Sequence, residues 1–318
     1  MRGLVFNQTL RYREDLPMPA LPSGEARIQV LQAGVCSTDL HILKGYMNFT
    51  GILGHEFVGK VLESPEEPSW IGQRVVGEIN AACQKCFTCL SGTPTHCPHR
   101  TVLGIQGRDG AFADSLTLPI SNLHPVPETL TDDQATFVEP LAAACEIPQQ
   151  VRIRPSDRIV VIGDGKLGIL CAQVLALSGP FVQLLGKHPA HAAWISKYGI
   201  AYAGSPGDIR GQVDIVVEAT GNPSGFSLAM QLLRPRGTLV LKSTYKDSLA
   251  VNMAGIVIHE IRILGSRCGP FSPAIRLLEH GLVDVHPLIH ARYSLSQGLT
   301  AMERAAQSGT LKVLLQMG

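Results

Sequence analysis

The sequence predicts an α/β protein with a β-rich first part and a doubly wound parallel sheet in its second part. Up to residue 146, apolar and polar residues alternate, as in 26–32 and 58–63, and turn signals recur between them. After residue 147, short apolar strands alternate with helical segments, which indicates a parallel sheet covered by helices. A glycine-rich turn at 163–168 joins one such strand to a helix, as in dinucleotide-binding folds.

Composition and charge narrow the possible classes of protein. A chain of 318 residues with 45% hydrophobic content can form one or two domains with packed cores. Its net charge of +1 argues against nucleic acid as the main partner, because a phosphate-binding surface needs a basic excess. Apolar stretches are interrupted by glycine, proline or charged residues, and the N-terminus does not read as a signal peptide. We therefore expect a soluble, cytoplasmic protein that binds neither membranes nor nucleic acid.

The stretch from Cys36 to Glu56 contains residue types that bind zinc. A thiolate and an imidazole, here Cys36 and His55, are ligands of catalytic zinc sites, which keep one coordination position open. Asp39 could accept a hydrogen bond from the ligating imidazole and orient it. Alternatively, a cysteine in an apolar run such as 33–36 is a small buried residue.

Two side chains of the same stretch can move a proton. Thr38 offers a hydroxyl group next to the expected metal, and His41 could pass a proton from it to solvent.

Four further cysteines form a cluster with metal-binding spacing. They are Cys83, Cys86, Cys89 and Cys97, in the pattern Cys-x2-Cys-x2-Cys-x7-Cys. Four thiolates close a tetrahedral shell without an open position, so the pattern predicts a structural zinc site. An iron–sulfur cluster or a redox thiol pair is the alternative, since the first three cysteines share a ferredoxin spacing. The isolated Cys145, Cys171 and Cys268 are expected to be core thiols.

The metal motifs resemble those of the zinc-containing medium-chain dehydrogenases and reductases, which include alcohol, sorbitol and threonine dehydrogenases. The motifs are Cys36-x-Thr38-Asp39-x-His41 and Gly54-His55-Glu56. The resemblance implies that Cys36 and His55 bind the catalytic zinc, while Thr38 and His41 relay the proton of the alcohol. It also implies that Glu56 lies close behind the metal.

The same resemblance suggests the third ligand of the catalytic zinc. The segment Phe137-Val138-Glu139-Pro140-Leu141-Ala142 resembles the Glu-Pro stretch of the sorbitol dehydrogenase branch, which implies that Glu139 completes the metal shell. The alternative is an ordinary glutamate at a helix start ahead of a proline. The chain departs from many relatives in having Cys145-Glu146 where they have a histidine.

The second part begins with a dinucleotide-binding fingerprint. A strand at 157–162 and a helix at 169–177 flank the turn Gly163-Asp164-Gly165-Lys166-Leu167-Gly168. Its glycines permit a tight turn, and the helix N-terminus offers free amides to a pyrophosphate, so Gly163, Gly165, Lys166, Leu167 and Gly168 are candidate cofactor contacts. A purely structural glycine turn is the alternative.

Later elements complete the expected sheet. Strands are expected at 181–185, 213–218, 238–241 and 261–264, and helices near 190–198 and 226–233. Thr220, after the strand at 213–218, lies in a segment that resembles the family's cofactor cleft.

The end of the second strand bears on the choice of cofactor. An acidic residue there would hold the ribose hydroxyls of NAD, but this chain has Gly186-Lys187-His188. The missing acid and the positive charge of Lys187 predict NADP over NAD. Alternatively, Lys187 and His188 belong to a solvated loop.

The resemblance implies a discontinuous domain organisation. A GroES-like catalytic domain would contain residues 1–146 and 272–318, with a Rossmann domain inserted at 147–271. Helices are expected at 273–281 and 296–308. Lys312 resembles a basic position near the cofactor phosphates, although without the family it would be a surface lysine. A homodimer or homotetramer would pair through the strand near 261–266.

The expected function is that of a zinc-dependent alcohol dehydrogenase acting on CH–OH donors (EC 1.1.1.-). It would transfer hydride between an alcohol or polyol, or the corresponding aldehyde or ketone, and NADP or NAD, with one catalytic and one structural zinc per chain. An alternative is an NADPH-dependent carbonyl reductase in biosynthesis, because NADPH usually serves reduction. Another is a zinc-ribbon binding module built on Cys83–Cys97, but that segment lacks a basic, aromatic surface.

Overall fold

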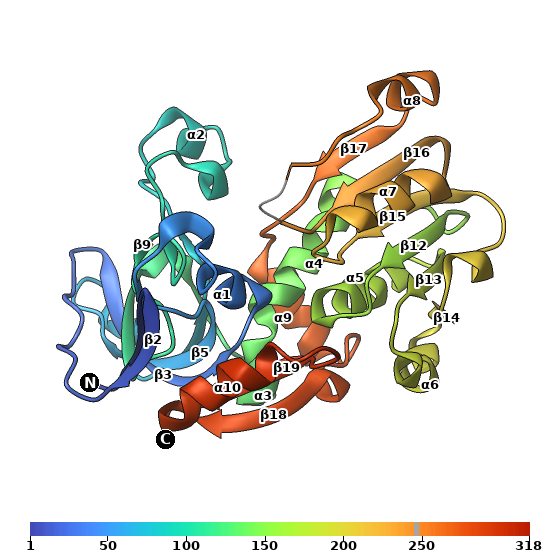
Figure 1. Cartoon of the computed structure of the whole chain (residues 1–318). Coiled ribbons are helices and arrows are strands. Elements are labelled where there is room, and N and C mark those ends of the chain that lie inside the picture. Colours follow the sequence, from blue (N-terminus) through green and yellow to red (C-terminus); the bar gives the residue numbers. More distant parts are fainter. Residues whose placement is uncertain (245–247) are drawn as a thin grey trace. The chain divides into compact units, whose positions relative to one another are not determined.

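The computed structural model describes residues 1–244 and 248–318, and it divides into two compact units (Figure 1). Unit 1 contains residues 1–139 and 271–318, and unit 2 contains residues 140–270. The boundary between the units falls in the first turn of helix α4 (Val138–Gln150). The domain limits expected from the sequence, after residues 146 and 271, stay a prediction.

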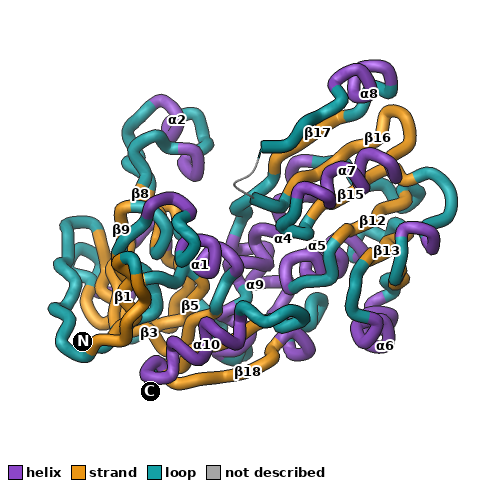
Figure 2. Tube along the Cα trace, viewed as in Figure 1, coloured by secondary structure: helices purple, strands orange, loops and turns teal. Residues whose placement is uncertain are grey.

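Unit 1 is rich in strands, as Figure 2 shows. Its largest sheet has seven strands, ordered β11-β6-β5-β3-β19-β18, with β10 also paired to β3. These strands are β3 (Glu25–Gly34), β5 (Glu56–Glu63), β6 (Arg74–Gly77), β10 (Ser115–Pro119), β11 (Leu123–Pro125), β18 (Ile289–Ser294) and β19 (Lys312–Gln316). Two smaller sheets are formed by β1 (Gly3–Asn7), β2 (Thr9–Arg13) and β4 (Gly51–Ile52), and by β7 (Asn80–Ala81), β8 (Thr101–Leu103) and β9 (Gly107–Arg108).

The helices of unit 1 are short. They are α1 (Ser37–Ile42), α2 (Phe87–Leu90), α3 (Asp132–Thr136), α9 (Phe271–Glu279) and α10 (Gly298–Ala305). The core beneath them includes Phe112, which is fully buried. A side chain at Gly54 would lie 2.4 Å from the ring of Phe112, so the backbone of the Gly54-His55-Glu56 motif packs directly on this ring.

Unit 2 is a six-stranded parallel sheet with helices, and the predicted doubly wound topology is confirmed. The strand order is β14-β13-β12-β15-β16-β17, so the order reverses between β12 and β15. The strands are β12 (Arg158–Ile162), β13 (Phe181–Leu185), β14 (Ala201–Ala203), β15 (Val213–Glu218), β16 (Leu233–Leu241) and β17 (Arg262–Gly265). The helices are most of α4, together with α5 (Lys166–Ala176), α6 (Ala192–Ile195), α7 (Pro223–Leu232) and α8 (Met253–Ile258). Ligands of such sheets bind at the carboxyl ends of the strands, at the reversal.

Most of the expected elements are present, with ends shifted by a few residues. The strands expected at 26–32 and 58–63 lie within β3 and β5, and the helix expected at 273–281 is α9. The sequence did not predict β18 and β19, which return the end of the chain to the large sheet of unit 1. In the part of the chain that the structure describes, no helix combines the length and the apolar character that crossing a membrane requires.

Candidate metal and cofactor sites

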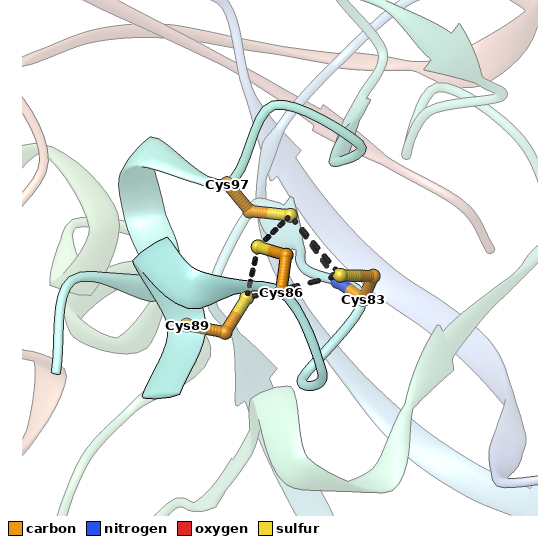
Figure 3. A group of neighbouring side chains, drawn as sticks. All are labelled: Cys83, Cys86, Cys89 and Cys97. Atoms are coloured by element: carbon orange, nitrogen blue, oxygen red, sulfur yellow. Dashed lines mark hydrogen bonds between the residues drawn. The ribbon is translucent and has the colours of Figure 1, made fainter. Parts of the chain in front are cut away.

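The four clustered cysteines converge on one point, as Figure 3 shows. Their sulfur atoms are separated by 3.5 Å (Cys86 to Cys89), 3.7 Å (Cys86 to Cys97), 3.5 Å (Cys83 to Cys97) and 4.0 Å (Cys83 to Cys89). A tetrahedron with zinc–sulfur bonds of about 2.3 Å has edges of about 3.8 Å. The cluster therefore has the size of a closed zinc–thiolate site.

The pKa values of two thiols in this cluster are shifted in opposite directions. The backbone amide of Lys85 lowers the pKa of Cys83 to about 6, whereas desolvation and the neighbouring Cys86 raise the pKa of Cys89 to about 12. Adjacent thiolates repel one another, so a bound cation is needed to hold all of them deprotonated at neutral pH.

A second group of metal-binding side chains lies at the start of α1 and of β5. The ligand atoms of Cys36, His55 and Glu56 all lie within 4.8 Å of one another. Asp39 contacts both Cys36 and His55. One of its carboxylate oxygens accepts the backbone N–H of Cys36 at 2.8 Å, and the other lies 3.3 Å from Nδ1 of His55. Asp39 thus occupies the place expected for a residue that orients a ligating imidazole.

The charge state of His55 reflects these neighbours. Burial alone lowers the pKa of this imidazole, but the Asp39 carboxylate and the Cys36 sulfur beside it raise the pKa well above the usual value. The buried Nδ1 of His55 and Oδ1 of Asp39 do not meet hydrogen-bond geometry at their separation of 3.3 Å. The carboxylate of Asp39 and the sulfur of Cys36 therefore both favour a positive charge at this buried position.

Glu56 is held by a lysine from the last strand of the chain. Its Oε2 accepts a hydrogen bond from Nζ of Lys312, and both side chains are almost fully buried, at 1% and 0% exposure. The ammonium group also lies 5.4 Å from the centre of the Phe137 ring. The surface position considered for Lys312 is therefore wrong, because β19 carries it into the interior beside the metal-binding group.

Glu139 occupies the first turn of α4 and is half-buried. Its role as third zinc ligand stays a prediction. The acid that groups with Cys36 and His55 among the described residues is Glu56.

The two proposed proton-transfer residues share helix α1. The Thr38 hydroxyl lies 3.7 Å from the sulfur of Cys36, and His41 is one turn further along the helix. Residues three apart on a helix lie on one face, so Thr38 and His41 are neighbours. Burial, followed by the charge of Lys44, lowers the pKa of His41. At neutral pH the ring is therefore uncharged and can accept a proton.

The glycine-rich turn of unit 2 has the conformation that its sequence predicts. Gly163 has φ = +109°, and Gly165 is the N-cap of α5, with open space where its side chain would be. A side chain at Gly168 would lie 1.8 Å from the carbonyl oxygen of Gly163, so helix and turn pack backbone to backbone. Lys166 and Leu167 form the first turn of α5, whose free amides can receive a phosphate.

Other predicted cofactor residues follow the neighbouring strands. Gly186, Lys187 and His188 follow β13, and Thr220 follows β15, so all lie at the same edge of the sheet as the glycine-rich turn. The backbone N–H and the hydroxyl of Thr220 both donate to Glu218, at 2.7 and 2.5 Å. Sequence reasoning did not identify Asp164 as a partner of His188, although it stands inside the predicted fingerprint.

Comparison with known proteins gives related matches over both units. The alcohol dehydrogenase GroES-like domain matches residues 22–128, and the zinc-binding dehydrogenase family matches residues 167–280. A sorbitol dehydrogenase from Halalkalibacterium halodurans is 30% identical over 95% of this chain and 94% of its own. An L-threonine 3-dehydrogenase from Streptomyces coelicolor is 30% identical over 95% of this chain and 94% of its own.

Solved structures show the same likeness. A short chain alcohol dehydrogenase from Escherichia coli CFT073, complexed with NADH, is 25% identical with a TM-score of 0.90 over 100% of this chain and 99% of its own. A protein described as a zinc-binding dehydrogenase from Sinorhizobium meliloti 1021, bound to NADP, is 25% identical with a TM-score of 0.89 over 99% of this chain and 98% of its own.

The buried pair of Lys312 and Glu56 generates a stability prediction. Replacing Lys312 with methionine leaves a buried carboxylate without its partner, which should lower the free energy of unfolding by about 3–5 kcal/mol. Urea denaturation followed by far-UV circular dichroism measures the loss. The double variant Lys312→Met, Glu56→Gln removes both charges and should recover part of it. A single variant as stable as the wild type would show that the pair does not contribute.

Proposed function

Because the chain belongs to the zinc-containing medium-chain dehydrogenases and reductases, we propose that Cys36, His55 and Glu139 hold its catalytic zinc. It is a nicotinamide-dependent oxidoreductase that transfers hydride between an alcohol and the corresponding carbonyl compound, and zinc is its metal. We assign the structural zinc to the four-cysteine cluster defined above. The observation that carries the catalytic assignment is the convergence of the partly buried Cys36 and the buried His55, with the Asp39 carboxylate beside the imidazole.

The zinc ion, when bound, supplies a Lewis acid for an alcohol or carbonyl oxygen. The protein residues around it supply orientation and proton transfer. Asp39 holds both the backbone of Cys36 and the ring of His55, so the two ligands keep one geometry. Lys312 binds Glu56 and holds this carboxylate beside the ligands.

Thr38 and His41 handle the proton in this proposal. During alcohol oxidation, the Thr38 hydroxyl accepts the proton of the substrate and gives up its own to His41. His41 has a ring nitrogen available for this proton because burial and the charge of Lys44 lower the pKa of His41 and keep the ring uncharged. In the reduction of a carbonyl compound, the proton moves in the opposite direction.

We propose a polyol or another multiply hydroxylated alcohol as substrate. The support is the similarity over nearly the whole chain to a sorbitol dehydrogenase, a D-arabinitol dehydrogenase from Uromyces fabae and an L-galactonate-5-dehydrogenase from Escherichia coli. The alternative, an NADPH-dependent carbonyl reductase, is favoured by one observation. Position 186 carries no acidic side chain, and the exposed Lys187 that follows it offers a positive charge to a 2′-phosphate. We do not propose the zinc-ribbon binding module, because the relatives are dehydrogenases and their similarity extends over both units of this chain.

A homodimer is proposed from the edge of the unit 2 sheet. Strand β17 is the last in the strand order, and Ile263 in it is 38% exposed. Helix α8 adds Val257 and Ile258, which are 72% and 74% exposed. An open strand edge next to apolar side chains favours pairing with a second copy. Free thiols at Cys83, Cys86, Cys89 and Cys97 are in keeping with a cytoplasmic location, which we also propose.

Replacing Cys36 with serine tests the catalytic assignment. Zinc content, measured by mass spectrometry of the metal, should fall from two ions to one per chain, and turnover of sorbitol, arabinitol and their ketoses should be lost. Cofactor binding, followed by NADPH fluorescence, should persist because unit 2 is unchanged. The matched variant Cys145→Ser, in unit 2, should retain both zinc ions. Full activity of the Cys36 variant without the second zinc would refute the assignment.

A pair of substitutions at Thr38 tests the proton path. Thr38→Ala should lower kcat by about 10²–10⁴-fold, since it removes the general acid–base group, while zinc content stays the same. Thr38→Ser keeps a hydroxyl and should retain most of the activity. Steady-state kinetics distinguishes the two, and equal rates for both variants would exclude the hydroxyl from the chemistry.

Light scattering of the purified protein tests the dimer. The wild type should have twice the mass of one chain, and Ile263→Lys should yield monomers because it charges the edge strand. Leu177→Lys places the same charge at a position that is 45% exposed after α5, and it should remain dimeric. A monomeric wild type would contradict the proposal.

A further inference from the structure

A cluster of titratable side chains lies next to the glycine-rich turn and takes no part in the proposed chemistry. Asp164, inside the turn, is 5% exposed and receives donors from the segment that follows β13 and from β14. The pKa of its carboxyl is lowered, because donors from His188, Lys187 and Tyr202 outweigh the effect of burial. An ionised, buried acid therefore lies beside the end of the second strand.

The carboxylate of Asp164 accepts hydrogen bonds from the turn that follows β13 and from Tyr202 in β14. Its Oδ2 accepts the backbone N–H groups of Lys187 and His188 at 3.1 and 2.8 Å, and the hydroxyl of Tyr202 at 3.0 Å. Its Oδ1 pairs with Nδ1 of His188 at 3.0 Å. A carboxylate has about four acceptor sites, so little remains for the two hydroxyl groups of a ribose.

Gly186 is the counterpart of this arrangement. A side chain at Gly186 would begin 2.2 Å from the Asp164 carboxyl carbon, so the acid found at this position in NAD-binding sheets cannot be accommodated here. The acid of this chain comes from the glycine-rich turn instead, and it faces the backbone of residues 187 and 188.

The contacts also orient His188. Because Nδ1 is engaged by Asp164, Nε2 is the ring nitrogen left to face outward, and the side chain is 37% exposed. Lys187 is exposed next to it. Asp164 accepts the backbone N–H of Lys187 and does not pair with its ammonium group, so it does not neutralise the positive charge of that side chain.

We propose that Asp164 is a positioning residue for cofactor choice, which holds the 186–188 turn so that Lys187 and His188 form the site for the 2′-phosphate of NADP. The inference rests on the proposed preference for NADP. A nearby buried imidazole, His191, has its Nδ1 3.4 Å from Oδ2 of Asp164. Asp164, His188 and His191 are also close enough to share a metal ion. The test below distinguishes a metal site from a positioning role of Asp164.

The test measures the binding of NADPH and NADH to the intact enzyme by fluorescence, together with kcat and KM for NADP and for NAD. Asp164→Asn keeps the shape of the side chain but removes its charge, and we expect the KM for NADP to rise about tenfold or more. The KM for NAD should change by less than about threefold, because NAD has no 2′-phosphate. Zinc should remain at two ions per chain.

Asp208→Asn is the matched control. The Asp208 carboxylate also accepts two backbone N–H groups, from Gly204 and Ser205 at 3.1 and 2.8 Å, but it is exposed and lies in another turn. Its substitution should leave the ratio of the two efficiencies unchanged. If Asp164→Asn does not fold, as judged by circular dichroism, His188→Gln provides the test, since it should weaken NADP binding selectively.

Three results would overturn the inference. A rise in preference for NADP in Asp164→Asn would mean that the carboxylate repels the phosphate. An unchanged preference, with Lys187→Ala losing it, would mean that the phosphate site exists without help from Asp164. A third zinc in the wild type that Asp164→Asn loses would identify a metal site. If instead the wild type itself prefers NAD, the proposed NADP preference fails, which is a separate result.

Discussion

The buried pair of Glu56 and Lys312 connects the two chain segments that form unit 1, residues 1–139 and 271–318. The residues are 256 positions apart in the chain, on β5 and β19, which flank β3 in the large sheet. In register, Gly34 of β3 stands opposite both Glu56 and Leu314, and a side chain at Gly34 would lie 2.5 Å from Oε2 of Glu56. Because Gly34 has no side chain, the carboxylate of Glu56 and the side chain of Lys312 can occupy the space beside it and contact each other. Removing charges from water costs free energy, so the buried pair is stable only when the register of β5, β3 and β19 places the two charged groups in direct contact.

The metal-binding group depends on this arrangement. His55 directly precedes Glu56, and Cys36 follows the end of β3 by two residues, so both proposed ligands stand at strand ends that the sheet holds in place. Asp39 then links the two ligands through short local contacts. The large sheet sets the approximate positions of the ligands, and these contacts complete the geometry.

Unit 2 uses a comparable device at the edge of its parallel sheet. A buried carboxylate, that of Asp164, is satisfied by donors from other segments, and a glycine at position 186 leaves room for it. In both units an acid accepts bonds from residues distant in the chain, and its neighbours are held at a functional site. The acid is stable because every partner is present at once.

Local patterns in the sequence predicted much of this structure. The spacing of Cys83 to Cys97 sets a small loop whose sulfurs must converge, and the strand–glycine turn–helix at 158–176 is contiguous in the chain. The strands β18 and β19 were missed. In β18 partly buried and exposed residues alternate, and β19 is only five residues long with a lysine at its start. The apolar run at 313–315 of β19 is too short for periodicity to tell a strand from the end of a helix.

The sequence by itself indicated the family, the cluster of four cysteines and the dinucleotide-binding turn, because each depends on residues close together in the chain. Only the tertiary structure decided that Lys312 is buried against Glu56 and that Asp164 faces the turn after β13. These outcomes depend on strand order and register, which bring distant residues together through packing. A charged side chain has the same identity at the surface and in the core, and only its partners in space decide which of the two is stable.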